Sequence, residues 1–156
     1  MDPRHRVRLA VNIVNGSTAF GVLVAALGRA RLARGPEGLL VGRGYRLPVP
    51  VAPAFCVGNV ILTRHDREAL AAGGRLLAHE ARHATQYAWC AGLVMLPLYF
   101  IAAAVSWVLT GDFAARNVFE RRAGLADGGY TDRELRPALA RIARKGAAGQ
   151  REAASG

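Results

Sequence analysis

One pentapeptide of this chain has the residue types and spacing of a metal-dependent hydrolytic site: His79-Glu80-Ala81-Arg82-His83. Two histidines four residues apart lie on the same face of a helix, so both imidazoles can reach one Zn²⁺ ion. The glutamate between them can then hold and deprotonate a water molecule bound to the metal. The alternative is a helix that simply carries exposed polar residues, and the context of the motif favours the metal site.

A catalytic zinc site normally has three protein ligands and one open position for water, so the motif needs a third ligand. Four residues elsewhere in the chain could supply it: Glu120, Asp127, His65 and His5. Glu120 is the best placed, because it lies in a predicted helix just after the apolar stretch that follows the motif. The alternative role for this carboxylate is an ion pair with Arg116 or with Arg121 and Arg122.

Three segments together resemble the gluzincin branch of the zincin metallopeptidases. They are His79-Glu80-x-x-His83-x-x-Gln86, the apolar stretch Leu-Pro-Leu-Tyr, and Asn117-x-x-Glu120-x-x-Ala123. The layout also resembles compact bacterial membrane-associated proteins that combine the same motif with a short apolar hairpin and a later Glu-x-x-Ala. The resemblance covers about residues 55–130. It implies that His79, His83 and Glu120 are ligands of Zn²⁺ and that Glu80 is the catalytic base.

One position departs from the gluzincin pattern. Many members carry an acidic residue four positions after the third ligand, where it orients a ligand histidine, but here this position is Gly124. We therefore expect the partner of the ligand histidine to come from elsewhere, either from Asp127 or from a backbone carbonyl. Gln86 could hydrogen-bond near the site or lie on the surface.

The composition favours a membrane over nucleic acid as the partner. The chain has 156 residues, enough for one domain, and 52% of them are hydrophobic. The net charge is +10, but the 20 arginines and single lysine are scattered with few aromatic residues between them, so nucleic-acid binding is not expected. A surface that faces water and anionic lipid explains the charge better. Cys56 and Cys90 form no disulfide framework, which fits the cytoplasmic side of a membrane.

The hydropathy pattern and the turn residues predict a mainly α-helical fold with a small β-strand or hairpin element. We expect a single compact domain over residues 1–130 and a basic, largely disordered tail over 131–156. The predicted elements are an apolar helix at 9–28, a Gly- and Arg-rich connection at 29–46, a strand region at 47–63 with an edge or hairpin strand at 55–62, a short helix ending near 72, the metal helix at 75–96, a return helix at 98–110, a third-ligand helix at 113–124 and a short helix at 132–145.

The uncharged segment 84–111 determines whether the expected ligands can meet. As one straight helix it would be about 42 Å long and would place Glu120 on the opposite side of a bilayer from His83. If Pro97 turns the chain, each arm is roughly 21 Å long and the second arm returns to the motif. A shared metal ion therefore requires a helical hairpin. The sequence leaves open whether segments 9–28 and 84–111 span a bilayer or pack as buried helices.

The strand ahead of the metal helix could hold an extended substrate peptide through backbone hydrogen bonds, as zincins commonly do, or be an ordinary structural strand. The group that stabilises a developing oxyanion is left open among four residues: Tyr130, Tyr99, His65 and Arg82.

These inferences predict a membrane-associated zinc metallopeptidase that faces the cytoplasm and hydrolyses peptide or protein substrates. The alternative is a non-catalytic membrane-associated scaffold with a structural or vestigial metal site, in which His65 or Asp127 would be a fourth ligand. A third hypothesis is a basic protein that docks on anionic lipid or nucleic acid through its arginine-rich termini.

Overall fold

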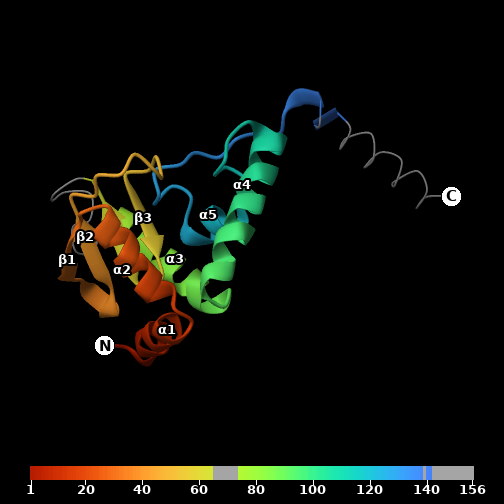
Figure 1. The fold of residues 1–156 in the computed structure, drawn as a ribbon. Helices are drawn as coiled ribbons and strands as arrows, with labels where there is room; N and C mark the ends of the chain where they lie inside the picture. The colour runs from red at the N-terminus through yellow and green to blue at the C-terminus, as the bar shows by residue number, and fades with distance from the viewer. Residues whose placement is uncertain (65–73, 139, 142–156) are drawn as a thin grey trace.

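The structure, a computed structural model, describes residues 1–64, 74–138, 140 and 141. Figure 1 shows helices on both sides of one small sheet and a long helix at one side of the molecule. The helices are α1 (Pro3–Val14), α2 (Ser17–Leu27), α3 (Arg75–Trp89), α4 (Met95–Thr110) and α5 (Val118–Ala123), with 3₁₀ turns η1 (Pro36–Gly38) and η2 (Gly92–Val94). The strands are β1 (Arg31–Arg34), β2 (Leu40–Arg43), β3 (Ala54–Val57) and β4 (Val60–Thr63). The predicted mainly helical fold with a small β element is confirmed.

The sheet has the strand order β1-β2-β4-β3, so β3 lies at its edge. Strands β3 and β4 form an antiparallel hairpin that turns at Gly58 and Asn59, where Gly58 has a φ of +61°. Strand β4 also pairs in parallel with β2. The expected edge or hairpin strand is thus present as two strands, and residues 47–53 of the predicted strand region are not part of the sheet. The connection predicted over residues 29–46 contains two strands instead, β1 and β2.

Helices α2 and α3 cover opposite faces of the sheet (Figure 1). On the α2 side, Ala25 packs with Val60 and Leu62. On the α3 side, Leu77 and Ala84 pack with sheet residues that include Ile61. The side chains of β4 are buried along its whole length because both faces of this strand are covered. This packing fixes α3, the helix that carries the His-Glu-x-x-His motif, against the centre of the fold.

The prediction of one apolar helix over residues 9–28 is wrong in its start, and the segment forms parts of two helices. Helix α1 begins at Pro3, where Asp2 accepts a hydrogen bond from the backbone N–H of Arg4. The chain then bends by 73° between α1 and α2. Gly16 at the bend has a φ of +77°, and the side chain of Asn15 accepts hydrogen bonds from the backbone N–H and the hydroxyl of Ser17. Asn15, Gly16 and Ser17 therefore form a junction between two helices in the middle of the segment.

The predicted hairpin turns at a different place from the one expected. The metal helix was predicted to reach residue 96 but α3 ends at Trp89, and α4 begins at Met95 before the predicted residue 98. The turn is made by Ala91 and Gly92, which have φ values of +54° and +79°. Pro97 lies in the first turn of α4, where a backbone N–H would have no partner within the helix, so it does not break the chain.

The helix predicted at 113–124 is shorter than expected. Helix α5 begins at Val118, and Asn117 caps it by accepting a hydrogen bond from the N–H of Phe119. Asp112 accepts hydrogen bonds from the N–H groups of Ala114 and Ala115 in the turn before α5. Residues 131–136, within the described part of the predicted tail, form no helix or strand, and helical structure is described at 137, 138, 140 and 141. The short helix predicted to end near residue 72 lies outside the described residues.

Candidate metal centre

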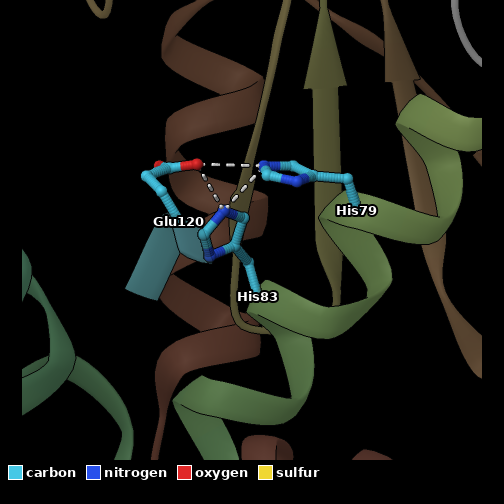
Figure 2. A group of neighbouring side chains, drawn as sticks. All are labelled: His79, His83 and Glu120. Atoms are coloured by element: carbon cyan, nitrogen blue, oxygen red, sulfur yellow. Dashed lines mark hydrogen bonds and ion pairs between the residues drawn. The ribbon is translucent and has the colours of Figure 1, made fainter. Parts of the chain in front are cut away.

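Two elements bring three ligand-type side chains together (Figure 2). His79 and His83 project from adjacent turns of α3, and Glu120 projects towards them from α5. The Nε2 atoms of the two histidines lie 3.0 Å apart, and Glu120 Oε2 lies 3.2 Å from His79 Nε2 and 3.6 Å from His83 Nε2. All three residues are buried. The hairpin of α3 and α4 therefore does return the chain to the motif, as co-ligation requires.

In each imidazole, the hydrogen-bond partner of Nδ1 shows which ring nitrogen carries the hydrogen. His79 Nδ1 lies 3.0 Å from the carbonyl oxygen of Gly124, which can only accept, so Nδ1 is the donor. His83 Nδ1 lies 2.8 Å from Gln86 Oε1. The amide of Gln86 is oriented by its Nε2, which donates to the carbonyl of Phe119 at 2.9 Å, so His83 Nδ1 is also a donor. In the neutral imidazoles both Nε2 atoms therefore present lone pairs to one common point.

Glu120 completes the set with a further acceptor. Its Oε1 accepts a hydrogen bond from the hydroxyl of Tyr99 at 2.5 Å, while its Oε2 is buried without a hydrogen-bond partner among the described residues. Three acceptor atoms that face one another at this range repel unless a proton or a cation lies between them. Ligands at about 2.0–2.1 Å around a tetrahedral ion are roughly 3.3 Å apart, close to the observed separations.

The acidity of the cluster follows from the same geometry. Burial alone would lower the pKa of His79, but Glu120 and Glu80 more than offset this effect and raise the pKa above its usual value. For Glu120, burial opposes ionisation, yet the two histidines, when one carries a proton on Nε2, and the hydroxyl of Tyr99 hold its pKa well below the usual range. A proton is therefore the natural occupant of the point between the three side chains when no cation is there.

Glu80 lies beside this cluster without belonging to it. Its side chain is buried and its Oε2 has no hydrogen-bond partner among the described residues. Burial raises the pKa of Glu80 to about 7, although the neighbouring histidines oppose the shift. A carboxyl group with this pKa can both accept and release a proton near neutral pH. Its position next to His79 and on the same cavity wall gives it access to a reacting molecule at the cluster.

An open cavity of about 520 Å³ gives access to the cluster. Its walls come from β3 and the loop before it, from α3, from the first turns of α4 and from Tyr130. Apart from His79, Glu80, His83 and Glu120, the lining is almost entirely apolar and includes Phe55, Leu96 and Phe100. Among the described residues, the titratable side chains that line it are His79, Glu80, His83, Glu120, Cys56 and three tyrosines, Tyr87, Tyr99 and Tyr130.

The alternative third ligands do not reach the cluster in the described part of the chain. His5 is on α1, and its Nε2 lies 3.2 Å from Oε2 of Glu37 on η1. Asp127 accepts hydrogen bonds from Arg75 and Arg82, both at 2.8 Å. His65 lies outside the described residues. Within the residues that the structure describes, the grouping of His, Cys, Asp and Glu side chains suited to a metal ion is His79, His83 and Glu120.

The oxyanion candidates differ in how free their polar groups are. The Tyr99 hydroxyl donates to Glu120, and Arg82 donates to Asp127 and to the carbonyl of Ala123. Tyr130 lines the cavity with its ring centroid 6.1 Å from that of His79. Burial raises the pKa of Tyr130 to about 12, so its hydroxyl stays protonated and can donate. Of these candidates Tyr130 is the best placed to stabilise a developing negative charge.

Two features of the site were missed by sequence reasoning. The carbonyl of Gly124 contacts His79, and a Cβ atom on Gly128 would lie 2.6 Å from the ring of His79. The Gly124 carbonyl settles the partner that was left open between Asp127 and the backbone. Gly128 is the one sequence signal for this packing, because a residue without a side chain lets the backbone lie close to a ring.

Comparison with known proteins adds no assignment. No protein-family model, curated protein or solved structure matches this chain. The functional argument therefore depends on the geometry of the site and on the resemblance of its motifs.

Proposed function

We propose that this protein is a zinc-dependent metallopeptidase, similar in its site to the gluzincins, that hydrolyses peptide bonds at or near the cytoplasmic face of a membrane. The observation that supports this proposal most directly is the convergence of three buried acceptor atoms at one point. His79 Nε2, His83 Nε2 and Glu120 Oε2 lie within 3.6 Å of one another at the base of an open cavity. An unpartnered carboxylate oxygen of Glu80 lies beside them.

The donor set fits zinc better than the other common cations. Two imidazole nitrogens and one carboxylate oxygen are a zinc set, whereas Mg²⁺ and Ca²⁺ prefer oxygen ligands only. Three protein ligands also leave a coordination position open to the cavity, which is the arrangement of a catalytic rather than a closed structural site. When bound, zinc supplies the acidification of a water molecule and the polarisation of a peptide carbonyl.

The residues of the chain then have separate tasks. His79, His83 and Glu120 hold the ion, and Gly124, Gln86 and Tyr99 orient them through the hydrogen bonds described above. Glu80 accepts the proton of the attacking water at its carboxylate and passes it to the leaving amine nitrogen. Tyr130 donates a hydrogen bond to the carbonyl oxygen as negative charge develops on it.

Strand β3 supports a peptide as the substrate. It is the edge strand of the sheet, and residues 54–57 line the same cavity as the cluster. Its outer edge makes no backbone hydrogen bond among the described residues beyond the pairing with β4. An extended peptide could add to this edge and bring a carbonyl group to the metal point. The apolar lining at Phe55 and Leu96 favours apolar side chains on either side of the cleaved bond.

Metal analysis of the purified protein tests the first half of the proposal. We expect about one zinc ion per chain in the unmodified protein and its loss in both His79→Ala and Glu120→Ala. The two substitutions lie on different helices, so a parallel loss tests the shared site and not one residue. His5→Ala, which removes a candidate ligand that pairs with Glu37 away from the cluster, should keep its zinc. An unmodified protein without zinc after reconstitution would overturn the proposal.

Turnover tests the second half, with Glu80→Gln as the decisive variant. A library of quenched fluorescent peptides with apolar residues is the probe. We expect hydrolysis by the zinc-loaded protein and a loss of at least about 100-fold in Glu80→Gln, which should retain its zinc. Equal activity in this variant would contradict the assigned role. Zinc binding without hydrolysis of any library member would favour the scaffold alternative.

A further inference from the structure

Helix α4 has an exposed apolar face that no described element covers. Six of its large apolar side chains are at least 43% exposed: Leu98, Phe100, Ile101, Val105, Trp107 and Val108. Figure 1 shows the helix at one side of the molecule, with the sheet on its inner side. No formally charged residue occurs between Arg82 and Asp112. An exposed face of this length and composition has a partner in the working state of the protein.

The width of this face distinguishes a bilayer from a second protein chain. At about 100° per residue, the exposed positions cover one half of the helix circumference and the buried or half-buried positions cover the other half. A seam with one partner helix is a narrower stripe, whereas a helix that lies in a lipid surface immerses a broad face. The helix with its preceding turn, Gly92–Thr110, is also long and apolar enough to cross a membrane.

The inner face of α4 argues against a span, because the body of the protein is attached along its length. Tyr99 donates to Glu120 of α5 near the middle of the helix, and Ser106 contacts the carbonyl of Asp112 and the N–H of Arg116. Further along, the carbonyl of Leu109 accepts from the N–H of Arg136. A spanning α4 would draw these attached segments and their charges towards the hydrocarbon, where an unpaired charge is strongly disfavoured.

The end of α4 has the residues of a membrane interface. Trp107 is half-exposed and stacks on Phe113, with ring centroids 6.2 Å apart. The guanidinium of Arg136 lies 5.1 Å from the centroid of the Trp107 ring and donates a hydrogen bond to the backbone carbonyl of Trp107. An indole beside an arginine is suited to the level of the lipid headgroups, because the ring is amphipathic and the guanidinium can pair with an anionic lipid there.

We propose that α4 lies in the plane of an anionic lipid bilayer with this outer face immersed and does not span it. The aqueous side then holds the sheet, α3 and α5. Phe100 belongs to the outer face and also lines the cavity. Leu96, about one turn earlier, lines the cavity as well. The cavity therefore opens beside the lipid surface. In this orientation, and resting on the proposed peptidase activity, the substrate is a membrane-bound polypeptide cleaved next to the bilayer.

Vesicle flotation tests the surface without using metal or turnover, so its result is independent of the proposed activity. The protein should float with vesicles of phosphatidylcholine and phosphatidylglycerol, and less with phosphatidylcholine alone. The double variant Val105→Glu, Val108→Glu should reduce the bound fraction about ten-fold or more. Val7→Glu, an equally exposed valine on α1, is the matched control and should bind normally. Equal binding by the double variant would overturn the proposal.

The depth of Ile101, at the midpoint of Gly92–Thr110, separates an in-plane helix from a span. The variant Ile101→Trp, with both natural tryptophans replaced by phenylalanine, places one fluorophore there. Lipids brominated near the headgroup should quench it more strongly than lipids brominated near the bilayer centre. Strongest quenching by the deep bromines would show a span and overturn the in-plane assignment. A lipid-free dimer that Val105→Glu, Val108→Glu dissociates would assign the face to a second copy instead.

Discussion

The Nδ1 atom of His79 lies 3.0 Å from the carbonyl oxygen of Gly124, so this imidazole is oriented by the backbone of the loop after α5 and not by an acidic side chain. The loop is held in place from α3 itself. Arg82 donates to the carbonyl of Ala123 at 2.6 Å and to Asp127 at 2.8 Å, and Arg75 also binds Asp127. The helix that carries the histidines thereby positions the carbonyl that orients one of them.

Substitution of Gly124 by alanine should weaken zinc binding. Gly124 has a φ of +87°, and a Cβ atom there would lie 2.7 Å from the Arg82 guanidinium and 2.9 Å from the Asp127 carboxylate. The Arg82 and Asp127 side chains, which hold this loop, must then shift, and alanine is strained at this φ, so the carbonyl is held less firmly against His79. Loss of such an orienting contact typically costs about 10–100-fold in metal affinity. Competition with a chromogenic zinc chelator measures the change.

Gly129→Ala is the matched control for this prediction. Gly129 has a φ of +82°, close to that of Gly124, but a Cβ atom there would have no neighbour within 4 Å. The variant therefore strains the same loop without displacing its contacts. Equal weakening of zinc binding by both variants would mean that loop strain, and not the bond between Gly124 and His79, is responsible.

Tyr99→Phe should weaken zinc binding by about ten-fold while leaving the fold intact. The hydroxyl of Tyr99 donates to Glu120 Oε1, and this bond leaves Oε2 directed at the two histidines. Without it the carboxylate can rotate. Tyr87→Phe is the control, because this ring lines the same cavity and its hydroxyl makes no hydrogen bond to a described residue. An unchanged zinc affinity in Tyr99→Phe would show that the ligand helices alone orient Glu120.

The sequence predicted which residues come together at the site better than it predicted the path of the chain. The spacing of His79 and His83 is a helix property, so a local pattern was enough to place both imidazoles on one face. Glu120 could be named because it lies in a predicted helix just after the apolar stretch, and a shared metal ion then required this stretch to form a hairpin. The turn was assigned to Pro97 since proline breaks helices, but a proline in the first turn of a helix has no such effect. The turn residues Ala91 and Gly92 have no comparable signature.

Other features could not be read from the sequence because they are tertiary. Strand β1 is exposed along its whole length and contains two arginines, so its sequence has neither alternation nor an apolar run. It pairs with β2, which in turn pairs with β4, a strand that comes later in the chain. The interaction of Gly124 with His79 is a backbone contact between distant segments, and side-chain patterns cannot encode it directly.

Asn12→Ala should destabilise the fold by about 1–3 kcal/mol, because it leaves buried polar partners without a hydrogen bond. The Asn12 amide is fully buried and donates to Asn59 Oδ1 at 3.1 Å and to the carbonyl of Ala84 at 2.8 Å. It thus links α1 to the sheet and to α3 directly after His83. Urea denaturation measures the change. Val14→Ala, at an 87% exposed position on the same helix, should change the stability by less than about 0.5 kcal/mol.

Zinc should stabilise the folded protein, because its ligands come from two separate helices and meet only in the fold. At a free zinc concentration about 100 times the dissociation constant, the gain is about 2.7 kcal/mol, or roughly 5–10 °C in Tm for a chain of this size. Mg²⁺ should give no such shift, since it prefers oxygen ligands. His79→Ala should lose the shift, whereas Glu80→Gln should keep it, because Glu80 lies beside the cluster and is not a proposed ligand. A Tm that zinc raises equally in His79→Ala would place the stabilising ion elsewhere on the protein.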